Sequence, residues 1–281
     1  MLSGSSLSLT ASATALLAAS SSLGSVISAR QNDNSGATGF AQPSQWLTII
    51  AGSNLGEPIN VVISNASDPS VLTEEGFASY ASSLYFSPNN CGGFDLGGPQ
   101  AANLGQGTKN QSDVYRYNFN QGITTCKESF DGGNHFRNWQ QASTQAWFLA
   151  VSVEMNATSN HMIVDNGYDL GRNYLVGNAT KSGGTMSPQD QSRYTTTATR
   201  MDVDVDQSSI NHGISTDGQV VVLTVTRTAS GNGANPTTSA SSSSTSGGSS
   251  GTGARADALR ASLWVASIAG STLAAALMLT S

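Results

Sequence analysis

The chain is apolar and uncharged at both ends and polar in between, and this pattern limits how much of it can form a folded body. Residues 7–23 and residues 261–280 contain no Asp, Glu, Lys or Arg. Between them lies a body of roughly 190 residues, 42–228, which is within the usual size of a single domain. We therefore expect one folded domain flanked by segments of another kind.

The N-terminal apolar stretch has the features of a secretory signal peptide. It ends in small residues up to Ala29, which Arg30 follows, as at a signal-peptidase cleavage site. A buried core helix is the alternative, but the stretch has no polar face to turn towards solvent. We expect residues 1–29 to be removed during export and residues 30–41 to form a short linker.

The C-terminal end has three zones that together are typical of a lipid-attachment signal. Residues 229–253 are dominated by Ser, Thr and Gly, which bury too little apolar surface to fold, so we expect a disordered stalk. A short polar spacer and an apolar tail follow over residues 254–281. This order predicts exchange of the tail for a GPI lipid at Ser250, or at its neighbours Ser249 or Gly251. A retained single membrane span is the alternative.

Two further features agree with export. The two cysteines, Cys91 and Cys126, predict one disulfide that closes a loop of about 35 residues, with two buried free thiols as the alternative. Asn-x-Ser/Thr sequons predict N-linked glycosylation at Asn65, Asn110, Asn156 and Asn178. Together these patterns place the domain on the outer side of the plasma membrane or in the cell wall, reached through the secretory pathway.

The charge of the chain restricts its partners. Only 11% of the residues are charged, and the formal net charge is −6, with no run of Lys or Arg. Nucleic acid and anionic lipid surfaces both need clustered basic residues, so we expect neither as a partner. The expected partners are the membrane, through the lipid anchor, and a cell-wall polysaccharide or a protein ligand. We find no cofactor motif and expect no cofactor.

Hydrophobic periodicity inside the body predicts a mixture of strands and helices. Nearly all of residues 59–63 are apolar, as in a central strand, whereas residues 71–85 show the three- to four-residue spacing of an amphipathic helix. Other predicted strands are 46–51, 114–119, 135–139, 147–154, 195–205 and 220–227; residues 168–176 predict a second helix, and residues 92–107 a loop. The fold class is therefore α+β, a single domain with a mixed or antiparallel sheet packed by one or two helices.

Candidate chemistry centres on His135. If residues 135–139 form a strand, His135, Arg137 and Trp139 share one face, because side chains alternate along a strand. A histidine beside an arginine suits an anion clamp, since arginine offers a forked donor and histidine a titratable proton. The favoured interpretation is nevertheless a half-exposed polar strand face, with Trp139 covering the edge of the core.

A second group of titratable residues lies within sixteen positions further along the chain. Glu154, His161, Asp165 and Asp169 match no metal-ligand spacing, so a solvated loop is the favoured interpretation, and we expect no metal. No Gly-x-Ser-x-Gly elbow, phosphate loop or dinucleotide fingerprint is present. The common hydrolase and nucleotide-binding classes are disfavoured on this ground.

Several motifs in order give the chain a resemblance to known groups. Over residues 46–227 it resembles a group of fungal secreted, GPI-anchored proteins of unknown function; the motifs lie at residues 58–62, 132–139, 147–152 and 166–173. The same order is distantly similar to the LssY C-terminal domain of bacterial membrane proteins, through His135, Arg137, Trp139, His161 and Arg172. The resemblance implies export and adds Arg172 to the candidate site residues.

Two functional hypotheses remain. The first is a GPI-anchored glycoprotein of the cell surface or cell wall with a non-catalytic binding or structural role. The second is an extracellular hydrolase, or a phosphate- or anion-handling enzyme, that uses His135, Arg137 and His161, with Arg172 as a further candidate. Convergence of these side chains in one pocket would favour the second hypothesis.

Overall fold

The structure is a computed structural model that describes residues 38–89, 91–92, 98–120 and 124–231 of the 281-residue chain. The predicted signal peptide, the GPI-attachment residues Ser249, Ser250 and Gly251, the apolar tail and nearly all of the predicted stalk lie outside this part. Within the described part, no helix combines the length and the hydropathy that a membrane span requires.

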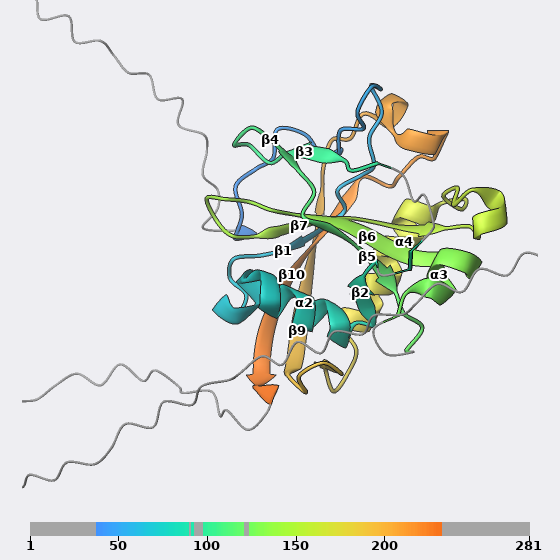
Figure 1. The fold of residues 1–281 in the computed structure, drawn as a ribbon. Coiled ribbons are helices and arrows are strands. Elements are labelled where there is room, and N and C mark those ends of the chain that lie inside the picture. Colours follow the sequence, from blue (N-terminus) through green and yellow to red (C-terminus); the bar gives the residue numbers. More distant parts are fainter. Residues whose placement is uncertain (1–37, 90, 93–97, 121–123, 232–281) are drawn as a thin grey trace, which may run out of the picture. The chain divides into compact units, whose positions relative to one another are not determined.

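The body is built on one eight-stranded mixed sheet (Figure 1). The prediction of an α+β domain with a mixed or antiparallel sheet is therefore confirmed. The strands lie in the order β2-β5-β6-β7-β1-β10-β9-β8. Their bounds are β1 Val61–Ile63, β2 Phe86–Pro88, β5 Asp113–Tyr117, β6 Gly133–Gln140, β7 Trp147–Glu154, β8 Thr185–Met186, β9 Arg193–Asp202 and β10 Gln219–Ala229. β1 and β10 pair in parallel and the other neighbours pair antiparallel.

The short strand β1 lies in the centre of the sheet, between β7 and β10. All three of its residues are buried, because layers cover both faces of the sheet at this point. The prediction of a central strand from its apolar run is therefore confirmed.

Two helices cover one face of the sheet: α2, Glu74–Ser83, and α4, Gly167–Ala179. Thr73 caps α2 by accepting a hydrogen bond from the Gly76 amide at 3.1 Å. Phe77 stacks on Trp147 of β7, with ring centroids 4.4 Å apart, and anchors the larger hydrophobic cluster. A third helix, α3, Cys126–Asp131, was not predicted, because six residues are too few to show a helical period.

A second layer of loops and one hairpin covers the other face. The hairpin consists of β3, Ala101–Asn103, and β4, Thr108–Asn110, so the predicted loop 92–107 contains a strand. The predicted strand 46–51 forms only two isolated bridges, from Leu47 to Pro58 and from Ile49 to Ala101. These segments enclose the second hydrophobic cluster, which includes Trp139.

The body extends slightly beyond the limits set from the sequence. Phe40, placed in the linker by the sequence, is completely buried and packs edge-on against Phe148, with ring centroids 5.5 Å apart. At the other end, β10 runs to Ala229, the first residue of the predicted stalk. Packing in the second hydrophobic cluster therefore fixes Phe40, and pairing with β9 fixes the end of β10, although composition alone assigned both to flanking segments.

The predicted disulfide is present between Cys91 and Cys126, whose Cα atoms are 4.8 Å apart. Cys126 is the first residue of α3, so the bridge ties the start of this helix to the chain segment after β2. A structural disulfide fits an exported protein.

Candidate functional site

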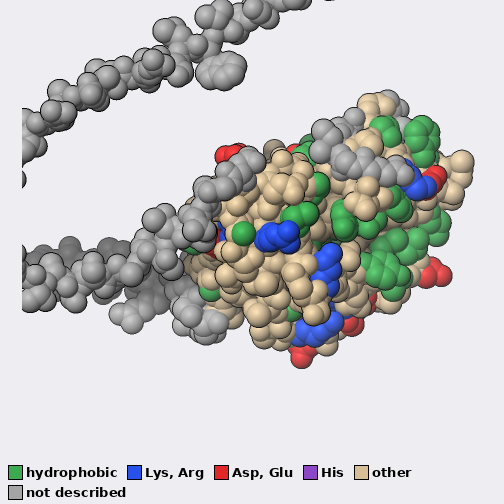
Figure 2. Space-filling model, turned by 90° about the horizontal axis from the view of Figure 1, so that it is seen from below, with side chains coloured by type: hydrophobic (Ala, Val, Ile, Leu, Met, Phe, Trp, Pro, Cys, Tyr) green, Lys and Arg blue, Asp and Glu red, His purple; other side chains and the backbone are tan. Residues whose placement is uncertain are grey.

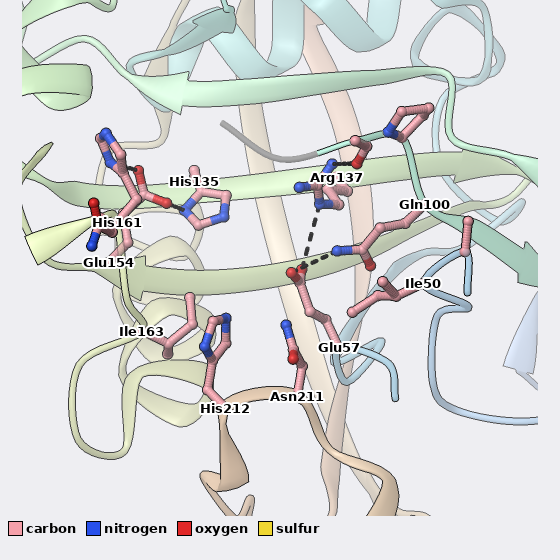
Figure 3. Close-up of a pocket in the computed structure, with 14 residues that line it drawn as sticks. Ile50, Glu57, Gln100, His135, Arg137, Glu154, His161, Ile163, Asn211 and His212 are labelled. Carbon is pink, nitrogen blue, oxygen red and sulfur yellow. Dashed lines mark hydrogen bonds and ion pairs between the residues drawn. The ribbon is translucent and has the colours of Figure 1, made fainter. Parts of the chain in front are cut away.

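All three histidines of the chain line one pocket of about 330 Å³ on the face of the sheet opposite α2 and α4 (Figure 3). They come from three separate segments: His135 from β6, His161 from the loop after β7, and His212 from the 3₁₀ helix η4, Asn211–Gly213. With only three histidines among 281 residues, this convergence makes the pocket the candidate site. We call it the histidine pocket.

Strand register brings the floor of the pocket together. Along β6, His135 and Arg137 point to the pocket face, whereas Phe136 between them enters the core beneath α2. His135 pairs with Ser152 of the neighbouring strand, and Glu154 ends that strand two residues later, on the same face. The interpretation of a half-exposed polar face was wrong: His135 is only 3% and Arg137 only 5% exposed, because the second layer covers them.

One carboxylate, that of Glu154, connects His135 and His161. Its Oε1 lies 2.8 Å from Nδ1 of His161, and its Oε2 lies 3.3 Å from Nδ1 of His135. On its other side, His135 meets the Ser152 hydroxyl at 3.3 Å. Glu154 is itself only 5% exposed, so the prediction of a solvated loop at this position was also wrong.

A buried arginine lies behind Glu154. Arg116 of β5 donates to Glu154 and, at 2.7 Å, to Oε2 of Glu128 on α3. Burial, together with the nearby Glu154 carboxylate, raises the pKa of Glu128 from 4.5 to about 8 against the opposing effect of Arg116. Neutral pH therefore favours the protonated form of Glu128. Burial, followed by the charge of Arg116, lowers the pKa of His135 well below its ordinary value.

A second polar group forms the opposite wall of the pocket (Figure 3). Glu57 accepts a hydrogen bond from Nε2 of Gln100 at 2.7 Å and faces Nε of Arg137 at 3.6 Å. Arg137 also donates to Oε1 of Gln111 at 2.8 Å. This arginine is therefore engaged by protein acceptors, which weakens the anion-clamp interpretation.

The rim histidines have a strained backbone. His161 and His212 adopt positive φ angles of 52° and 62°, and Asn160 beside His161 has the same φ of 52°. Side chains other than glycine adopt this left-handed region at a cost of about 1–3 kcal/mol, usually where function requires it. Both conformations place a titratable ring at the mouth of the pocket.

The carboxylates around His135 are a candidate metal site. Within the described ranges, Glu128, His135 and Glu154 form one group whose potential ligand atoms all lie within 4.8 Å of one another. Arg116 contacts both carboxylates of this group, so a guanidinium already supplies the positive charge that a metal ion would bring. The residues present do not fit a divalent ion.

Arg172, the fourth candidate, is not among the residues that line the pocket. It is 1% exposed and binds Asp217 through both terminal nitrogens, at 2.6 and 2.8 Å, and Asp169 at 3.2 Å. These contacts join α4 to the segment that leads into β10. Arg172 thus has a structural role, and Asp169 lies with it rather than with Glu154.

Sequence reasoning missed several residues of the site: Glu57, Gln100, Arg116, Glu128 and His212. One signal was available for Arg116, since it is a charged residue among Val114, Tyr115 and Tyr117 of a predicted strand, in a chain with few charges. The others come from loops and a short helix, where no periodicity reveals burial.

The comparisons with known proteins add no assignment. No family profile, no curated protein and no solved structure matches the chain.

Proposed function

We propose that the protein is an exported, GPI-anchored glycoprotein of the cell surface or cell wall whose domain binds a small polyhydroxylated ligand, such as a terminal sugar unit of a polysaccharide, in the histidine pocket. The observation that carries the proposal is the meeting of all three histidines at one pocket. The disulfide and the sequence patterns at both chain ends support the exported setting.

The size and polarity of the pocket favour this ligand class. A volume of about 330 Å³ is at the small end of ligand sites, so it suits one small molecule or a chain end rather than a protein surface. Its polar groups offer both donors and acceptors, and a sugar hydroxyl can act as either. Since Arg116 and Arg137 are both paired with carboxylates, the site lacks the excess positive charge that a phosphate needs.

A thermal-shift screen of the secreted protein tests the proposal. We expect at least one neutral mono- or oligosaccharide to raise the melting temperature in a concentration-dependent way, because a ligand that binds only the folded state stabilises it. His161→Gln should abolish the shift, since this ring lies at the mouth of the pocket and is less buried than that of His135. The exposed Arg200→Gln serves as the control and should bind like the parent.

Two results of this screen would contradict the assignment of the pocket. If no saccharide in the panel shifts the melting temperature, or if His161→Gln binds like the parent protein, the assignment of the pocket is wrong. A shift with inorganic phosphate alone would instead support the anion-handling alternative.

The 2.8 Å contact between Glu154 and His161 favours one second candidate, an acid–base enzyme. A carboxylate that orients a histidine is the arrangement that activates water for hydrolysis. In the same screen, release of a reducing sugar from the bound saccharide, lost in His161→Gln, would establish this candidate.

The lipid anchor has its own test. We expect phosphatidylinositol-specific phospholipase C to release the protein from intact cells, because that enzyme cleaves the lipid of a GPI anchor. A variant with Ser249→Pro, Ser250→Pro and Gly251→Pro should not receive the lipid, so the phospholipase should release none of it from cells. Protein that resists the phospholipase but dissolves in detergent would show a retained membrane span instead.

A further inference from the structure

A second hollow, bordered by α4 and by residues of β5, β6 and β7, is lined by aromatic rings. Tyr117, Phe119 and Tyr174 border a groove of about 320 Å³ together with Gly133, Asn134, Val153 and Asn178. Tyr174 is 58% exposed, and hydrophobic side chains gather at one end of the face seen in Figure 2. We call this hollow the aromatic groove.

The groove also contains a polar group that lacks a partner. The Asn134 side chain donates to the Gly171 carbonyl at 3.1 Å, but its Oδ1 is buried without a hydrogen-bond partner among the described residues. Asn134 is 8% exposed. A buried acceptor left without a donor is costly, so a ligand hydroxyl or amide in the groove would gain from pairing with it.

The backbone at Phe119 is strained. Phe119 has a φ of 51°, which is unusual for a bulky residue, and the ring packs edge-on against Tyr117 at a centroid distance of 5.0 Å. The side chain is only half-buried, and it lines the groove instead of entering the core.

The lining of the groove includes a glycosylation sequon. Asn178 begins the sequence Asn178-Ala179-Thr180 and lies in the last turn of α4. Tyr174 precedes it by four residues on the same helix, and residues at this spacing lie side by side on a helix surface. A sugar attached to Asn178 would therefore start next to the Tyr174 ring.

We infer that the first N-acetylglucosamine of an N-linked glycan on Asn178 packs into the aromatic groove. The apolar face of the sugar covers Tyr174 and the ring of Phe119, and its polar substituents reach Asn134 Oδ1. Burial of these rings stabilises the folded domain. The inference rests on the exported setting in the proposed function, because only a chain in the secretory pathway meets the glycosylation machinery.

The test uses the full chain expressed in a eukaryotic secretory host and trimmed with endoglycosidase H to one sugar per site. We expect peptide mapping to find Asn178 occupied and Asn178→Gln to lower the melting temperature by about 2–4 °C. The matched control is Asn110→Gln, whose asparagine is exposed on β4 and should shift the melting temperature by less than about 1 °C. In a Tyr174→Ala background, Asn178→Gln should lower the melting temperature by less than it does in the parent, because one of the rings that the sugar covers is already gone.

The inference is wrong if Asn178 is unoccupied in a chain that is glycosylated at other sequons. It is also wrong if Asn178→Gln lowers the melting temperature no more than Asn110→Gln does, or if it lowers the melting temperature of unglycosylated protein by the same amount. Free N-acetylglucosamine oligomers that stabilise the fully glycosylated protein through Tyr174 would also overturn it, because the groove would then be open to an external saccharide. A chain that carries no glycan at any sequon contradicts the exported setting itself, and so separates the two failures.

Discussion

The double variant Glu128→Gln/Glu154→Gln is expected to lose more free energy of unfolding than its two single variants lose together. The difference should be about 1–3 kcal/mol. Both carboxylates contact the buried guanidinium of Arg116. In Glu154→Gln, Glu128 can release its proton and balance Arg116, whereas Glu128→Gln removes a group that is already neutral at pH 7. Only the double variant leaves a buried charge without a partner, a situation that typically costs about 3–5 kcal/mol.

Urea unfolding at pH 7 of the parent, both single variants and the double variant measures this coupling. The control is Glu57→Gln combined with Glu154→Gln, because Glu57 faces Arg137 and not Arg116; these two changes should be close to additive. Additive costs for Glu128 and Glu154 would contradict the exchange of charge between them.

The same cluster gives the stability a pH dependence with a definite sign. Because the folded state raises the pKa of Glu128 from 4.5 to about 8, the folded state holds more protons than the unfolded state between these values. The contribution of this group is therefore fully present below about pH 4.5 and is lost as the pH rises towards 8. Glu128→Gln should reduce that loss in the same unfolding experiments.

Removal of the disulfide is the second change with a large expected effect. Cys91 and Cys126 are separated by 35 residues, and opening a loop of this length lowers the free energy of unfolding by about 3–4 kcal/mol in the chain-entropy model. We expect Cys91→Ser/Cys126→Ser to show this loss in urea. Hydrogen exchange should also increase in α3, since the bridge holds the first residue of that helix.

The single variants Cys91→Ser and Cys126→Ser provide the internal control. Each alone opens the same loop, so each should be as destabilised as the pair. A loss below about 1 kcal/mol in the double variant would show that the bridge does not restrain the unfolded chain as the model assumes.

Much of the fold could be predicted from local pattern. The alternation of β10 and the helical spacing of α2 appear as predicted, since each repeats a period long enough to recognise. β1 has only three residues, but its continuous apolar run marked it as a central strand. The strands β2, β3 and β8 have only two or three residues and rely on their neighbours for pairing. No local signal could reveal them.

The site was predictable only in part. Strand alternation correctly placed His135 and Arg137 on one face, and the structure brings His161 to the same pocket. Their burial depends on a second layer of loops, whose packing no periodicity encodes. Arg172 came from a resemblance of motif order, and the structure gives it a salt bridge to Asp217 instead.

The pairing of β10 with β1 has a consequence for how the chain must fold. Val61 pairs with Val221, so the two halves of the sheet are joined by residues that are far apart along the chain. Such non-local pairing slows folding, because the entropy of a large loop must be lost before the contacts form. A nascent chain cut short before residue 219 would expose β1 as an open edge, and the sheet would stay open to pairing with other chains until this last strand arrives.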